Sequence, residues 1–342
     1  MSSLLGQSIM SVVNLPESLI EARHITKIFS SGSIFRRRSV RAVDDVSLMI
    51  PKDETMIMTL AGESGSGKST IARLLLGLEM LTSGEILYRD KNIHAMSKKE
   101  KFQYRKEIQA IFQDPYAAYN PFYTARHALS VPIKRFDLAA TGQEEQQLIR
   151  EALEAVHLPP EIAQKYPHEL SGGERQRIII ARALIMRPRL IIADEPVSMI
   201  DTSLRAGVLN TILELKQKFG ISFIYITHDL STAYYLSDSI LVLYRGSIVE
   251  SGEIEAVLKN PMHPYLQQLI GSIPIPDPES RWPNRVAMRT EEITYRAEER
   301  RCKYYGRCPN AKDDCQKEVP PLVPVGRNHY VACGSVVPHT AK

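Results

Sequence analysis

The sequence has few cysteines, little excess charge of either sign and few aromatic residues. The chain of 342 residues contains one tryptophan and four cysteines, and aromatic residues make up 7% of it. Its net charge of +4, from 43 basic and 39 acidic residues, is too small to indicate a nucleic-acid partner by itself. The one dense basic run is Arg36 to Arg38, and a short run of this kind predicts a solvated loop. We therefore expect no nucleic-acid partner.

Long apolar runs are absent as well. No stretch has the roughly 20 consecutive apolar residues that a membrane-spanning helix needs. The most apolar region, residues 178–193, is interrupted by Arg182, Arg187 and Arg189. Residues 1–20 lack the leading cationic segment of a secretory signal. We therefore expect a chain that stays in the cytosol and does not itself cross a membrane.

The order of apolar patterns predicts an α/β fold. Hydrophobic residues make up 44% and charged residues 24% of the chain, which is ordinary for a globular protein. Strands that alternate with helices favour a core with a largely parallel sheet. Strands are expected at 22–29, 40–50, 55–61, 190–193, 222–226, 240–244 and 247–250, and helices at 69–78, 203–219 and through most of 97–186.

A glycine-rich segment between an expected strand and an expected helix predicts a phosphate-binding loop. Its pattern is G-x-x-x-x-G-K-S, formed by Gly62, Glu63, Ser64, Gly65, Ser66, Gly67, Lys68 and Ser69. The glycines let successive backbone N–H groups point at phosphate oxygens, and the helix N-terminus adds positive partial charge. Lys68 is expected to reach the β- and γ-phosphates, Ser69 to ligate Mg²⁺, and Thr70 to add a further hydroxyl.

A second apolar strand ends in two carboxylates. Asp194 and Glu195 follow the run 190–193, at the strand end where ligands gather in α/β sheets. We expect Asp194 to lie in the coordination shell of Mg²⁺ and Glu195 to be the general base that polarises the attacking water.

One further segment is typical of a known family. It resembles the signature sequence of ATP-binding cassette (ABC) proteins and consists of Leu170, Ser171, Gly172, Gly173, Glu174, Arg175 and Gln176. Such a helix N-terminus without bulky side chains is an anion site, yet Lys68 already serves the phosphates of its own chain. The resemblance implies that the signature completes the γ-phosphate site of an opposite subunit in a head-to-tail dimer. It also implies a P-loop NTPase fold, in which a mixed sheet with a RecA-like core carries an antiparallel β subdomain and a helical subdomain at about 97–186.

Four single residues match the same family. Gln113 resembles the glutamine of a loop that contacts Mg²⁺ or water, and His228 resembles the histidine that contacts the γ-phosphate. Asp201 resembles the aspartate of the family's D-loop, although Met199 and Ile200 replace the more usual alanine and leucine. Phe29 resembles the aromatic residue that stacks on adenine, while a buried core phenylalanine is the rival interpretation.

The chain is similar to one branch of this family, the oligopeptide/dipeptide permeases, and to their second (F-type) ATPase. The similarity lies in the basic loop before Ala42, in 112–116 with the nearby Asn120, and in 260–265. It implies a heterodimer with a related ATPase, two transmembrane permease subunits and an external solute-binding protein. This chain would be peripheral, at the inner face of the membrane. The cargo would be peptides, or else nickel or oligosaccharides. The alternative is a soluble ABC ATPase, similar to the accessory subunits of carbon–phosphorus lyase.

The four cysteines all lie near the end of the sequence. Cys302, Cys308, Cys315 and Cys333 have the spacing C-x5-C-x6-C-x17-C, without the close pairs of common zinc sites. Four thiolates suit a [4Fe–4S] cluster, which members of this branch carry; zinc suits them less well, and free thiols are a third possibility. We expect an N-terminal extension (1–20), a nucleotide-binding domain (21–260) and an irregular C-terminal module (261–342).

Overall fold

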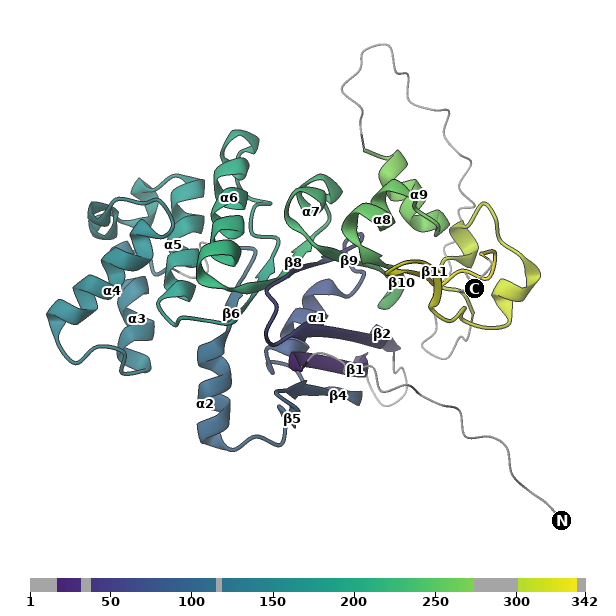
Figure 1. The fold of residues 1–342 in the computed structure, drawn as a ribbon, viewed down its shortest axis with the longest axis horizontal. Coiled ribbons are helices and arrows are strands. Elements are labelled where there is room, and N and C mark those ends of the chain that lie inside the picture. Colours follow the sequence, from purple (N-terminus) through teal and green to yellow (C-terminus); the bar gives the residue numbers. More distant parts are fainter. Residues whose placement is uncertain (1–16, 32–37, 115–118, 274–300, 337–342) are drawn as a thin grey trace, which may run out of the picture.

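The computed structural model describes residues 17–31, 38–114, 119–273 and 301–336 (Figure 1). Several features that the sequence singles out lie outside these ranges. They are most of the N-terminal extension, two arginines of the basic run, and the two residues after Asp114 in the glutamine loop, namely 1–16, Arg36, Arg37, Pro115 and Tyr116.

A large mixed sheet forms the centre of the described structure. Its strand order is β11-β12-β10-β9-β3-β8-β7-β6, and the five strands from β9 to β6 are mutually parallel. Every residue of β3 and β8 is buried, which explains why both strands are continuous apolar runs. The strands are β3 (Ile57–Ala61), β6 (Ile108–Ile111), β7 (Leu190–Asp194), β8 (Ser222–Thr227), β9 (Ser239–Tyr244), β10 (Ser247–Glu253), β11 (Val323–Gly326) and β12 (His329–Val331).

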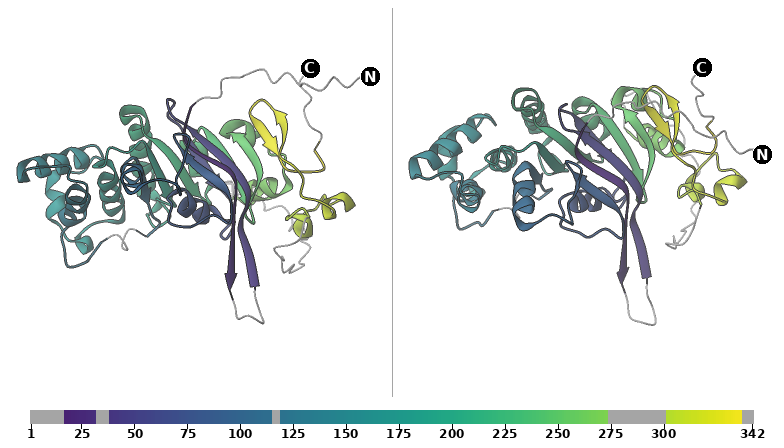
Figure 2. Two further views of the ribbon diagram at one scale, coloured as in Figure 1. Left: turned by 90° about the horizontal axis from the view of Figure 1, so that it is seen from below. Right: turned by 60° about the horizontal axis from the view of Figure 1, so that its bottom comes forward.

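A smaller antiparallel sheet has the order β2-β1-β4-β5. Its strands are β1 (Ser18–Ser31), β2 (Arg38–Pro51), β4 (Ser83–Tyr88) and β5 (Lys91–Asn92). Figure 2 shows β1 and β2 projecting together beyond the rest of the molecule at one end. At the other end they lie against the large sheet, with a shared core of side chains such as Ile25, Val46 and Ile224. This sheet confirms the antiparallel β subdomain.

Helices cover the large sheet and extend to one side of it. Helices α3, α4 and α5 share a core with α6 and with one face of the sheet, and Figure 1 shows them together at the end away from β11. Alternate sheet residues serve the two cores: Ile191 and Phe223 face these helices, whereas Ile192 and Ile224 face the small sheet. The helices are α1 (Lys68–Leu75), α2 (Lys98–Glu107), α3 (Ala125–Arg135), α4 (Gly142–Glu154), α5 (Gly172–Leu184), α6 (Thr202–Phe219), α7 (Leu230–Leu236), α8 (Ile254–Lys259) and α9 (Pro264–Gly271).

Five strands were not expected from the sequence, namely β4, β5, β6, β11 and β12. β4 and β5 complete the small sheet, and β6 lies inside the region 97–186 that was expected to be helical. The four residues of β6 (Ile-Gln-Ala-Ile) are too few for a period that separates a strand from a helix segment, so pairing with β7 decides the structure. Within the described ranges, no helix combines the length and the apolar content that crossing a bilayer requires.

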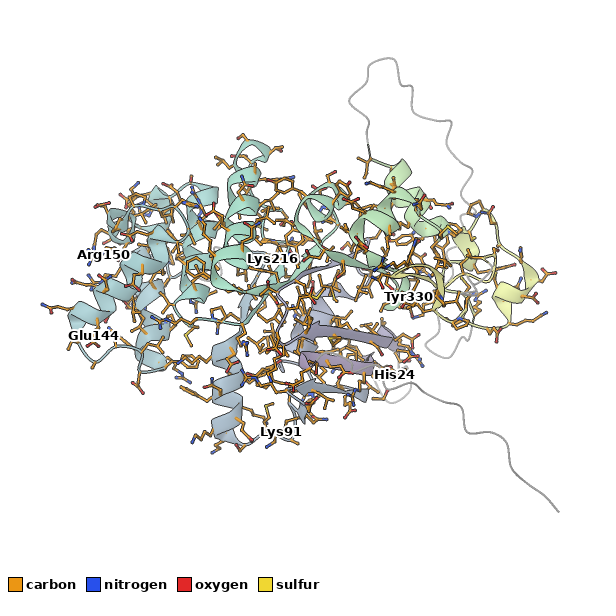
Figure 3. All side chains as sticks on the ribbon, viewed as in Figure 1. His24, Lys91, Glu144, Arg150, Lys216 and Tyr330 are labelled. Atoms are coloured by element: carbon orange, nitrogen blue, oxygen red, sulfur yellow. The ribbon has the colours of Figure 1, made fainter. Side chains whose placement is uncertain are left out.

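The described C-terminal residues continue the large sheet. β12 pairs with β10, and β11 pairs with β12, next to two short 3₁₀ turns at Tyr305–Arg307 and Asp313–Gln316. Figure 3 labels Tyr330 of β12 toward one end of the molecule and Glu144 of α4 at the other. This region is therefore only partly irregular, and it is built onto the edge of the ATPase sheet.

A fully buried carboxylate attaches this edge to the rest of the fold. Glu250 on β10 is 0% exposed and accepts hydrogen bonds from the backbone N–H groups of Met262 (2.9 Å) and His263 (2.7 Å). Nε2 of His329 on β12 lies 2.7 Å from Oε1 of Glu250, the oxygen that also accepts from Met262. Burial raises the pKa of Glu250, while these three partners oppose the rise. One side chain therefore links β10, β12 and the start of α9.

We predict that Glu250→Ala destabilises the fold strongly. The substitution leaves three hydrogen-bonding groups without their acceptor, two of them on the buried residues His263 and His329, which should lower the free energy of unfolding by about 3 kcal/mol. Urea unfolding followed by circular dichroism measures this. The control is Glu255→Ala, which removes an exposed ion pair with Lys259 and should change stability by less than about 0.5 kcal/mol. Equal losses in the two variants would contradict the role of Glu250.

Candidate functional site

An open cleft of about 980 Å³ lies beside the predicted phosphate loop. The cleft is lined by the small sheet, by the loop between β3 and α1, and by residues that follow β6, β7 and β8. Most of the expected nucleotide-site residues line it, namely Phe29, Gly62, Glu63, Ser64, Gly65, Gly67, Lys68, Ser69, Thr70, Gln113, Glu195 and His228. Ser66 is buried within the same loop, and its Oγ lies 3.4 Å from Nζ of Lys68.

At two positions of the loop, neighbouring backbone atoms leave no room for any residue other than glycine. Gly62 has φ 145°, and a Cβ there would lie 2.2 Å from the carbonyl oxygen of Leu243. Gly67 has φ 103°, and a Cβ there would lie 2.3 Å from the carbonyl oxygen of Ala42. Any side chain would collide at either position, so the tight loop depends on glycine at both ends.

Lys68 is the first residue of α1 and places its charge at the loop. Its Nζ donates hydrogen bonds to the carbonyl oxygens of Gly62 (2.7 Å) and Glu63 (2.9 Å). Burial lowers the pKa of Lys68, and the nearby carboxylates of Glu195, Asp194 and Glu63 oppose this fall. A cation and the N-terminus of α1 thus converge where the loop's N–H groups gather, which suits a polyphosphate.

The two carboxylates at the end of β7 have different surroundings. Asp194 accepts a hydrogen bond from the Ser69 hydroxyl, and burial raises its pKa. The pair combines a hydroxyl with a carboxylate beside the loop, and Mg²⁺ prefers such oxygen ligands. Glu195 has φ 48°, an uncommon conformation for a residue with a side chain, and such strain clusters at functional sites.

Gln113, Glu195 and His228 form one hydrogen-bonded group. Nε2 of Gln113 donates to Oε2 of Glu195 (3.1 Å), and Nδ1 of His228 lies 3.0 Å from Oε1 of the same carboxylate. The three residues follow β6, β7 and β8, which are parallel neighbours, so their carboxyl ends meet at one edge of the sheet. This arrangement could orient a water molecule and accept its proton.

The signature segment lies outside this cleft. Ser171 caps the N-terminus of α5: its Oγ accepts from the N–H of Glu174 (3.2 Å), whose carboxylate accepts from the N–H of Ser171 (2.7 Å). This pairing lowers the pKa of Glu174. Gly173 packs beside α6: a Cβ at this position would lie 3.6 Å from Leu204. Asp201 directly precedes the same helix. None of the signature residues or Asp201 lines the cleft; Leu170 and Gln176 are buried in the helical side.

Sequence reasoning missed several residues that line the cleft. Arg41 and Asp44 come from β2, Arg245 from the β9–β10 turn, and Lys303 from the C-terminal region. Nζ of Lys303 donates to Oδ2 of Asp44 (2.7 Å), to the carbonyl oxygen of Arg245 (2.9 Å) and to Oγ of Ser247 (2.6 Å). These residues belong to no local motif, and only the folded chain brings them together.

None of the four cysteines forms a disulfide, and they lie near one another. Burial raises the pKa of Cys302 to about 11, and the charges of the other three, Cys308, Cys315 and Cys333, add to the rise. The backbone N–H of Cys302 donates to the carbonyl of Cys315 at 2.9 Å. Among the described residues, however, no group of three or more histidine, cysteine, aspartate or glutamate side chains is arranged to hold a metal ion.

Comparison with known proteins agrees with the geometry of the cleft. The family described as "ABC transporter" matches residues 43–198, and the family described as "Oligopeptide/dipeptide transporter, C-terminal region" matches residues 249–315. The oligopeptide transport ATP-binding protein AppF of Bacillus subtilis is 38% identical over 93% of this chain and 97% of its own length. The oligopeptide transport ATP-binding protein OppF of Haemophilus influenzae is 37% identical over 96% of this chain and 100% of its own.

A solved structure shows the same fold. The ATP-binding cassette MJ0796, described as a dimer in a post-hydrolysis state bound to ADP and Pi, superposes with a TM-score of 0.60 at 26% identity. The match covers 69% of this chain and 98% of that one. With relatives matched over nearly their whole length, the chain belongs to the ATP-binding subunits of ABC transporters, in the oligopeptide/dipeptide branch.

Proposed function

We propose that this chain is an ATP-hydrolysing subunit that drives an importer of peptides. The observation that carries the proposal is the convergence of the phosphate loop with Glu195, Gln113 and His228 in one cleft. The match to the C-terminal region of oligopeptide/dipeptide transporters and the relatives named for oligopeptide transport support peptides as the cargo. They do not favour the alternative of a soluble ABC ATPase, while nickel and oligosaccharides remain alternative cargoes of the same machine.

The residues of the cleft divide the work of hydrolysis. Backbone N–H groups of the loop and the ammonium of Lys68 offset the negative charge of the triphosphate. Glu195 polarises the attacking water as general base, and Gln113 and His228 hold the carboxylate in place from two sides. Phe29 lines the cleft and is 40% exposed, with Nζ of Lys27 4.8 Å from its ring centroid; this exposure favours stacking on adenine over the role of a core phenylalanine.

The adjoining oxygen atoms fit a magnesium ion. Ser69 and Asp194, with the amide oxygen of Gln113, would hold it together with the substrate phosphates. When bound, the ion would neutralise charge on the transferring phosphoryl group.

In a dimer, the signature segment would contact the nucleotide of the other subunit. Ser171 caps a helix whose free N–H groups suit a phosphate, yet it lies outside the cleft of its own chain. A second ATPase in head-to-tail orientation would bring this helix to the other subunit's nucleotide. Asp201 precedes α6, whose Leu204 lies beside Gly173 of the signature segment. The structural relative MJ0796 is described as dimeric. We propose that the partner is a homologous but different chain.

The remaining partners follow from the family. Two transmembrane permease subunits would contact the chain at the inner face of the membrane, where it would be peripheral, and an external solute-binding protein would deliver the cargo. Affinity purification from membranes, with identification of the copurifying chains, tests this assembly. Recovery of soluble proteins alone would favour the alternative, a soluble ABC ATPase.

We predict that Glu195→Gln stops hydrolysis but not ATP binding. The amide keeps the shape of the side chain and removes the base, so turnover of the assembled transporter should fall by about 100-fold or more. Phosphate release measures the rate, and retention of radiolabelled ATP on the purified complex measures binding. The control Glu255→Gln changes an exposed carboxylate on α8 and should leave both unchanged. Undiminished hydrolysis by Glu195→Gln would refute its role.

We predict that Ser171→Arg abolishes hydrolysis by the assembled transporter while the separate chain still binds ATP. The arginine would block the helix N-terminus offered to the partner's nucleotide without entering its own cleft. The control is Thr141→Arg, which removes a similar N-cap at α4, where the Thr141 hydroxyl accepts from Glu144 N–H. Each change should lower stability by about 1 kcal/mol. Equal activity of the two variants would contradict a signature site shared between subunits.

The iron–sulfur cluster stays a proposal that rests on the cysteine pattern. The proximity of the four thiols supports it, whereas their present arrangement is not a ligand set. We predict a broad absorbance near about 400 nm in anaerobically purified protein if four thiolates bind [4Fe–4S]. Zinc without iron in elemental analysis would point to a zinc site, and the absence of both metals would identify free thiols.

A further inference from the structure

The phosphate loop is held from the C-terminal side of the chain through Glu63. The Glu63 carboxylate makes two parallel bonds to one guanidinium, with Nη1 of Arg307 at 3.0 Å from Oε2 and Nη2 at 3.2 Å from Oε1. The backbone N–H of Glu63 donates to the hydroxyl of Tyr265 on α9 at 2.8 Å. Both the side chain and the main chain of this one loop residue are therefore fixed by residues more than 200 positions later.

The two holding residues are themselves fixed by packing. Tyr265 is 1% exposed, and its ring centroid lies 4.7 Å from that of Tyr244 and 5.6 Å from that of Tyr304. The guanidinium of Arg307 lies 5.9 Å from the ring centroids of Tyr244 and Tyr304. A planar guanidinium placed against aromatic rings keeps its orientation better than a flexible lysine would. These contacts make the attachment of Glu63 rigid.

Charge gives the Arg307–Glu63 pair a second effect. Glu63 lines the cleft, so an unpaired carboxylate there would repel a polyphosphate. Arg307 stands behind Glu63, outside the lining of the cleft, and offsets this charge without occupying the space for the nucleotide. The pair is partly exposed, at 27% and 42% of the two side chains, so its value for overall stability is small. Its effect should therefore appear in nucleotide binding more than in folding.

We propose that Arg307, supported by Tyr265, is a positioning residue of the ATP site. It holds the phosphate loop in its binding shape and neutralises Glu63, and the inference rests on the proposed ATPase function. The segment from Cys302 to Cys308 that carries Arg307 also carries Lys303 into the cleft. The C-terminal region is thus part of the nucleotide site.

The test compares Arg307→Gln, Glu63→Gln and the double variant in the full-length chain. Titration with the fluorescent analogue mant-ATP gives the dissociation constant, and ATP hydrolysis by the assembled transporter gives KM and kcat separately. Arg307→Gln should weaken binding and raise KM by about three- to tenfold, the effect of one charged hydrogen bond, with kcat nearly unchanged. The double variant should recover part of the loss, since its loop no longer carries an unpaired carboxylate but still lacks the bond that holds it.

A matched control lies in the same region. Lys317→Gln breaks an exposed ion pair with Asp314 and should leave the dissociation constant, KM and kcat unchanged. Wild-type binding by Arg307→Gln, or a double variant that binds no better than Arg307→Gln, would overturn the inference. Absence of ATP hydrolysis in the wild-type assembly would instead overturn the proposed function, so the two failures are distinguishable.

Discussion

Close backbone packing around the phosphate loop is the constraint on which the site depends. The carbonyl oxygens of Ala42 and Leu243 approach Gly67 and Gly62 so closely that neither position has room for a Cβ. One neighbour belongs to the small sheet and the other to β9 of the large sheet, so the loop takes its shape only when both sheets are in place. Folding of the whole core and formation of the phosphate site are therefore one event.

The parallel order of β6, β7 and β8 brings residues that are far apart in the sequence to the phosphate loop. Each strand ends at the same edge of the sheet; Glu195 and His228 directly follow β7 and β8, and Gln113 lies two residues after β6. The strained backbone of Glu195 is held by a hydrogen bond from its N–H to the carbonyl of Ile226 at 2.9 Å. Sheet register therefore fixes the carboxylate that we assign as the base.

Local motifs explain how much of this could be predicted from the sequence. The loop 62–69 and the strand ends at Glu195 and His228 are contiguous patterns, and the cleft places them together as expected. The strand β6 was not predicted because its four residues are too few to show a distinctive period. Asp44 and Lys303 escaped because their proximity arises from three segments that meet only in the folded chain. Sequence patterns thus predict the residues that act on the nucleotide more readily than the distant residues that hold the site in place.

Three side-chain contacts attach the C-terminal region to the catalytic core, in addition to the chain connection itself. Buried Glu250 joins β12 and α9 to β10, Lys303 joins the cysteine segment to the β9–β10 turn, and Arg307 joins it to the loop. The contacts differ in burial, from 0% exposure at Glu250 to the partly exposed pair of Arg307 with Glu63. Lys303 directly follows Cys302 and Arg307 directly precedes Cys308, so the two residues of this segment that contact the nucleotide site adjoin the first two cysteines.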